Sequence, residues 1–237
     1  MSEKLPTVEE TISKIKSRGF WEVIIRPVKF DRERIRSLAA CKELIEGSVV
    51  RFRGWDYPHI NRYGIKSGID WVDSLEDWSD HLEYWRMYKS AQFSHIFGCI
   101  EDWGAAKIFW SQQSHTTPGY GLEFSCTLFI ITEIYEFAAR LAKKKVFDDW
   151  LKVSITLHGM KNRRLVTSDI RRSFGDYYIC NINEIPLSRK MSIDEVIGNS
   201  KEFAVEDTLS ILERFNWFNA PKGVFEEEQD KLIKGRL

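Results

Sequence analysis

The stretch from Ser48 to Ile60, SVVRFRGWDYPHI, gathers the side chains of this chain that are best suited to recognition or chemistry. Its first part, residues 48–53, is rich in valine and phenylalanine and predicts a strand. Gly54 and Pro58 then predict a turn. A strand that leads into such a turn presents a guanidinium, an indole, a carboxylate and an imidazole on one loop. We therefore expect a binding site made of Arg53, Trp55, Asp56 and His59.

A recognition loop must keep polar groups accessible, whereas a purely structural loop buries them with their hydrogen bonds satisfied. For this loop we expect a mixture of the two. Trp55 is expected to be buried as an anchor, while Arg53 and His59 reach outward to a partner.

A basic cluster is the best local candidate for an anionic partner. It consists of Lys161, Arg163 and Arg164. The cluster falls at the tip of a hairpin that we predict from residues 152–158 and 163–167. A solvated hairpin tip explains the same cluster without any partner. Because Lys plus Arg and Asp plus Glu both total 35, nucleic acid could be bound only through a local patch of this kind.

Known catalytic signatures are not found along the chain. There is no glycine-rich nucleotide loop, no H-E-x-x-H zinc motif and no G-x-S-x-G nucleophile motif. The five histidines are never within four positions of one another, so we expect neither a metal nor a cofactor. A hydrolase or nuclease remains the alternative if the fold assembles a site from dispersed residues. Those residues would be Asp56, His59, Glu101, Asp102 and His158.

Length and composition are typical of a globular domain. The chain has 237 residues, of which 43% are hydrophobic and 30% charged. It shows no apolar leader and no apolar run long enough to cross a bilayer, so we expect a cytoplasmic protein without membrane contact. Nine tryptophans indicate large buried surfaces, within the chain or between chains.

The order of predicted elements indicates an α+β fold with a mostly antiparallel or mixed sheet packed against several helices. We expect one domain over residues 1–220 and a charged tail with little structure of its own over 221–237. Strands are predicted over 20–26, 48–53, 92–99, 152–158, 163–167 and 177–182. Helices are predicted over 7–16, 31–46, 74–85, 127–141 and 204–215.

The helix expected over 74–85 rests on two local patterns. Ser74 and Asp77 fit the start of a helix by capping logic. The apolar residues that follow fall at helical spacing. On this helix we expect Trp78, Leu82 and Trp85 to be buried.

Three stretches resemble the hallmark sequences of a family of uncharacterised bacterial proteins. They are RGFWEVIIRP (18–27), RGWDYPHI (53–60) and TEIYEFAARLA (132–142). The resemblance implies a bacterial, cytoplasmic, single-domain protein. The aromatic content, without a clustered acid and base, favours a non-catalytic binding or adaptor subunit. Such a subunit would meet a protein partner through the Arg53–His59 loop or the tail.

Overall fold

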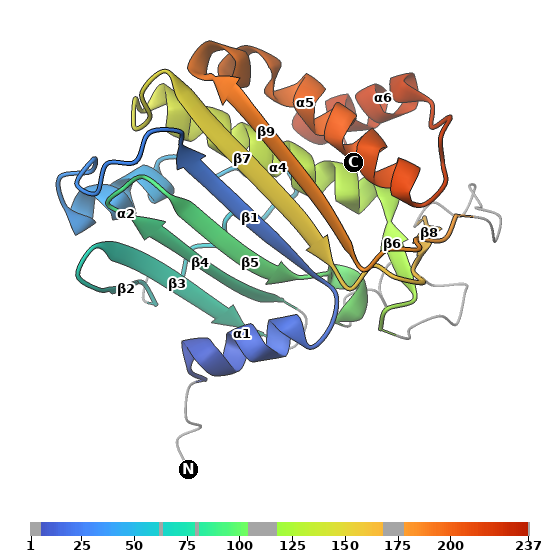
Figure 1. The fold of residues 1–237 in the computed structure, drawn as a ribbon, viewed down its shortest axis with the longest axis horizontal. Helices are drawn as coiled ribbons and strands as arrows, with labels where there is room; N and C mark the ends of the chain where they lie inside the picture. Colours follow the sequence, from blue (N-terminus) through green and yellow to red (C-terminus); the bar gives the residue numbers. More distant parts are fainter. Residues whose placement is uncertain (1–5, 62–63, 79–80, 104–117, 168–177, 237) are drawn as a thin grey trace.

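A seven-stranded antiparallel sheet organises the chain, in the order β2-β3-β4-β5-β1-β7-β9 (Figure 1). The computed structural model describes residues 6–61, 64–78, 81–103, 118–167 and 178–236. The strands of this sheet are β1 (Phe20–Pro27), β2 (Lys66–Ser67), β3 (Trp71–Asp77), β4 (Leu82–Tyr88), β5 (Phe93–Gly98), β7 (Trp150–His158) and β9 (Glu184–Ser192). A separate parallel pair joins β6 (Gly121–Glu123) and β8 (Arg164–Val166).

The helices cover the two faces of the sheet unequally. They are α1 (Val8–Lys16), α2 (Leu38–Glu46), α4 (Phe124–Lys143), α5 (Ile193–Arg214) and α6 (Lys222–Ile233), with a short 3₁₀ helix η1 (Ile100–Asp102). In Figure 1, α4 passes behind β7 and β9, and α5 and α6 lie next to it. The result is a single α+β domain, as the sequence predicts.

Side-chain alternation along the strands separates two apolar clusters. On the inner face, Trp21 and Phe93 belong to the main core, where the ring of Phe93 lies 4.8 Å from that of Phe137 in α4. On the outer face of β4 and β5, Ile15 of α1 packs in a smaller cluster. The other buried members of that cluster are Leu82, Tyr84, Ile96 and Trp103.

The predicted helix over 74–85 is wrong, because this segment belongs to the antiparallel hairpin of β3 and β4. Trp78 lies in the turn and is 49% exposed, whereas Trp85 and Leu82 are buried as expected. Residues 82–88, LEYWRMY, are rich in aromatic residues that favour strands. Pairing with β3 and β5 therefore overrides the local capping and spacing pattern.

Other boundaries also differ. Residues 48–53 form no strand, and only an isolated bridge joins Val50 to Tyr57. The second helix begins at Leu38 after the cap residue Ser37, not near residue 31.

The predicted hairpin of 152–158 and 163–167 does not form. β7 pairs with β1 and β9, while β8 pairs in parallel with β6. β9 was not predicted at all, and within the described part of 177–182 only Ile179 makes a bridge, to Arg164.

The C-terminal segment was expected to have little structure, and this is also corrected. It forms α6, whose Phe225 and Leu232 are fully buried in the main core. Gln229 donates to the hydroxyl of Thr132 at 3.0 Å, which ties α6 to α4.

A candidate binding surface over two buried carboxylates

Two carboxylates face each other across the β3–β4 hairpin on the inner side of the sheet. Glu76 pairs with Glu83 in the register, and both are only 4% exposed. Like charges directly opposite each other in a sheet are destabilising. The surrounding groups must therefore compensate the pair.

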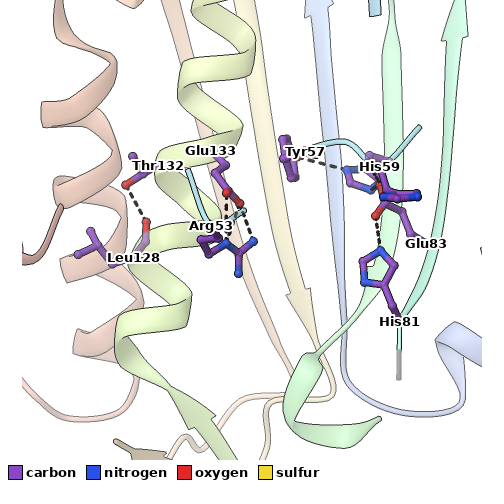
Figure 2. Close-up of polar contacts among 9 residues, drawn as sticks. Arg53, Tyr57, His59, His81, Glu83, Leu128, Thr132 and Glu133 are labelled. Carbon is purple, nitrogen blue, oxygen red and sulfur yellow. Dashed lines mark hydrogen bonds and ion pairs between the residues drawn. The ribbon is translucent and has the colours of Figure 1, made fainter. Parts of the chain in front are cut away.

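Glu83 is compensated by two hydrogen-bond donors and a further, nearby imidazole (Figure 2). The backbone N–H of His59 donates to Oε1 at 2.8 Å, and Nε2 of His81 lies 2.7 Å from Oε2. Nε2 of His95 lies 2.9 Å from Oε1. Burial acts to raise the pKa of Glu83, but the charge of His95 and the hydrogen bond and charge of His81 hold it well below its usual range.

The same pairing acts on His81. Burial acts to lower its pKa, but the hydrogen bond to Glu83 and the charges of Glu83 and Glu76 raise it above the ordinary value. An ionised Glu83 thus favours the protonated form of His81.

Glu76 is compensated less completely. Its Oε1 is buried without a hydrogen-bond partner, and Nε2 of His59 lies 3.9 Å away. Burial raises the pKa of Glu76, with smaller opposing effects from His59 and from a hydrogen bond with Asn61. The hairpin therefore carries one strongly paired and one weakly paired carboxylate.

The loop of residues 51–59 is fixed to β4 and β5 by two contacts of buried side chains. Tyr57 is buried, and its hydroxyl lies 3.2 Å from Nδ1 of His95. Trp85 donates from Nε1 to the backbone oxygen of His59 at 2.6 Å. Because its anchors are buried, the loop holds one position relative to the sheet.

Three partly exposed rings lie in contact with one another at the surface near Glu83. Trp78 is 49% exposed, and the side chains of His59 and His81 are 25% and 38% exposed. The ring centroids of Trp78 lie 4.9 Å from His59 and 5.7 Å from His81. We call these three residues the ring cluster.

Arg53 and Trp55 reverse the predicted orientation. Arg53 points inward, with its side chain 14% exposed, and its Nη2 and Nε lie 2.5 and 3.1 Å from Oε2 of the fully buried Glu133 of α4 (Figure 2). Trp55 was expected to be buried but is 45% exposed, with its ring centre 5.0 Å from the guanidinium of Arg53. The buried ion pair therefore positions an exposed indole.

The remaining loop residues are placed as follows. Asp56 accepts from Nε of Arg51 at 2.5 Å in a pair near the surface. His59 is partly accessible, as expected, and belongs to the ring cluster.

The predicted basic patch loses its central member. Arg163 is buried, with Nη2 lying 2.5 Å from Oδ2 of Asp102, and it donates further to the backbone oxygens of Gly121 and Gly159. The charge of Arg163 is therefore compensated by Asp102 inside the protein. Lys161 remains exposed, and the guanidinium of Arg164 lies 5.6 Å from the ring centre of Tyr120.

Among the dispersed residues of the alternative enzyme site, Glu101 and Asp102 lie together near Arg163. Asp102 contacts Arg163, and Glu101 accepts from the backbone N–H of Glu123. His158 lies 3.4 Å from Glu22 and 3.3 Å from Glu184. Burial raises the pKa of Glu101 to about 7.

Sequence reasoning missed the partners of His59. Glu76, His81, Glu83 and His95 join it in the structure. The alternation of residues 82–88 was the available signal, because it places Glu83, Trp85 and Met87 on one face of a strand.

Comparisons with known proteins found no relative of this chain. No protein-family model, curated protein or solved structure matches the chain. Among the residues that the structure describes, no three His, Cys, Asp or Glu side chains are grouped so as to hold a metal ion. No helix in the described part of the chain is long and apolar enough to cross a membrane.

Proposed function

We propose that the protein is a non-catalytic binding or adaptor subunit of a bacterial cytoplasmic complex. It engages a protein partner through the loop of residues 51–59 together with the ring cluster. The observation that carries this proposal is the pair of half-exposed indoles, Trp55 and Trp78, each supported by buried charged groups.

Tryptophan and arginine are the residue types that most often dominate binding energy at protein interfaces. Trp55 lies against Arg53, whose guanidinium is held by the buried Glu133. Trp78 lies against His59 and His81, which are held by Glu83. Rings that are already held in place lose little conformational freedom on binding. This arrangement supports a preformed binding surface.

The two tryptophans belong to one region of the surface. Trp55 precedes His59 by four positions in the chain. Even a fully extended chain of that length spans only about 14 Å. His59 in turn contacts Trp78. The proposal places the partner on this loop rather than on the C-terminal segment, whose apolar side chains pack inside the domain.

The test is affinity capture from the native host, read by quantitative mass spectrometry, followed by a dissociation constant for the captured protein. The variant is Trp55→Ala with Trp78→Ala. The control is Phe218→Ala, which removes an aromatic side chain that is 71% exposed elsewhere. Loss of one interface hot spot weakens binding by about 30-fold or more, so the double variant should lose the partner and the control should keep it. Equal capture by the double variant would contradict the proposal.

A hydrolase or nuclease is the second candidate, and one observation favours it. Glu76 has a raised pKa and lies beside the partly exposed imidazole of His59. A carboxyl group whose pKa is raised, next to an imidazole, is suited to general acid–base catalysis, which contributes about 10²–10⁴-fold in rate. Hydrolysis of model phosphodiesters and esters should then fall by that factor in His59→Gln. A wild-type rate equal to that of the variant would reject this candidate.

A further inference from the structure

The outer face of β1, β7 and β9 carries a row of unpaired cations. Arg26 pairs with Lys152 in the register, and Lys152 pairs with Lys190. All three point away from the main core, because the residues beside them, such as Ile25, Val153 and Met191, are buried on the other face. Neighbouring strands lie about 4.8 Å apart, so the row spans about 10 Å.

Within the described residues, no ion pair joins Arg26, Lys152 or Lys190 to a carboxylate. Like charges on adjacent strands repel. On the outer face, α1 packs against β4 and β5 and leaves the cation row uncovered. The row is therefore open to an external anion.

One exposed aromatic ring lies beside the row, and a second is in the segment that follows β1. Trp150 is 45% exposed, and the ammonium of Lys190 lies 5.1 Å from its ring centre. Phe30 is 81% exposed in the segment that follows β1. That segment is held at the same end of the sheet, since the N–H of Val28 donates to the backbone oxygen of Trp150 at 3.2 Å.

Hydroxyl groups occupy the next position along two of the strands. Ser154 and Ser188 are cross-strand partners, and their Oγ atoms lie 3.4 Å apart.

Asp149 is also exposed at the same end of the sheet, next to Trp150. Glu22 and Glu184 share the outer face at the other end of the strands, where both lie near His158. The positive charge is therefore confined to the end of the sheet that carries the cation row.

We infer that this face binds a single-stranded nucleic acid. The cation row meets consecutive phosphates, the serine hydroxyls donate to phosphate or sugar oxygens, and Trp150 and Phe30 stack on unpaired bases. An acidic peptide would use the cations but would leave the rings unused. A duplex would present its phosphates with its bases already stacked. Charge together with adjacent open rings therefore favours a single strand, on a face distinct from the one proposed for the protein partner.

The experiment is fluorescence anisotropy of the full chain with a labelled 12-nucleotide single strand, titrated between 50 and 200 mM salt. Three phosphate contacts predict a slope of log K against log salt of about −2. The variant Arg26→Gln/Lys152→Gln/Lys190→Gln should lose that slope. Trp150→Ala should weaken binding by about 5- to 150-fold, the effect of one lost stacking contact.

The matched control is Lys42→Gln/Lys143→Gln/Lys201→Gln, which removes the same charge from three helices. It should bind as the wild type does. Absence of single-strand binding by the wild type at 50 mM salt would overturn the inference. So would equal losses in the control and the sheet variant. Poly-glutamate or a duplex that binds as tightly as the single strand, with no effect of Trp150→Ala, would identify a general polyanion site and overturn the assignment to single strands.

Discussion

Trp78 and Trp85 lie in the same β-hairpin but in opposite environments. Trp78 is 49% exposed in the turn, whereas Trp85 is fully buried and donates its indole N–H to His59. Trp85→Ala should lower the free energy of unfolding by about 3 to 5 kcal/mol, because it leaves a cavity and frees the loop. Trp78→Ala should change it by less than about 0.5 kcal/mol. Urea denaturation measures both, and equal losses would contradict the placement of the two indoles.

Glu83 is expected to be the main anchor of the binding loop. Glu83→Ala leaves the imidazole of His81 and the His59 N–H without their acceptor. It also removes the charge beside His95, so it should cost about 3 to 5 kcal/mol. Glu83→Gln keeps an oxygen for the His59 N–H and should cost less. Chemical denaturation of the two variants checks the order. A glutamine variant as unstable as the alanine variant would mean that charge, not acceptor geometry, holds the loop.

The stabilising effect of His81 should depend on pH. Its pKa is raised in the folded protein, so its contribution is complete below the unfolded value of about 6.5 and is lost as pH rises through the folded value. The melting temperature of wild type should therefore exceed that of His81→Gln most at pH 5 to 6, and the difference should shrink toward pH 9.

A matched pair of proteins isolates the cause of this pH effect. In a Glu83→Gln background, His81 has lost the hydrogen bond and the main charge that raise its pKa, while burial still acts to lower it. Introducing His81→Gln there should no longer lower the melting temperature more at pH 5 to 6 than at pH 9. A pH-dependent difference that persists would assign the effect to another group.

Phe225 should make α6 an integral part of the domain. Its side chain is fully buried, with its ring 5.8 Å from that of Phe124 and 5.9 Å from that of Trp217. Phe225→Ala should cost about 3 to 5 kcal/mol and should make the segment after residue 221 sensitive to proteolysis. Val224→Ala is the neighbouring control, because Val224 is only partly buried. Rapid trimming of the wild-type segment without loss of the remaining fold would contradict this prediction.

The fold class was predictable because the local sequence of several segments favours the same secondary structure that the fold gives them. β1 and β5 lie close to their predicted positions, and the capping box of Thr7 and Glu10 begins α1 as expected. In these segments, propensity and tertiary structure agree. β9 was missed because it is an edge strand with few buried side chains, among them Ile185 and Met191, and it contains Pro186.

The candidate site was less predictable, because its geometry depends on distant pairings. Arg53 contacts Glu133 across 80 positions of the chain, and no local pattern distinguishes that ion pair from a surface arginine. His81 and Glu83 were assigned to a helix, where they would not have shared a face with His95. The choice between helix and hairpin for residues 74–85 therefore decided whether the cluster could be recognised.

The central position of β1 has a consequence for synthesis of the chain. Ile25 pairs with Phe93 on one side and with Val153 on the other. At about 5–20 residues per second, the roughly 70 residues between Ile25 and Phe93 take about 4 to 14 s to translate, and the stretch to Val153 takes nearly twice as long. During that interval Trp21, Val23 and Ile25 have no strand to pair with. The apolar side chains of β1 therefore stay without their sheet partners until β5 and then β7 leave the ribosome and complete the middle of the sheet.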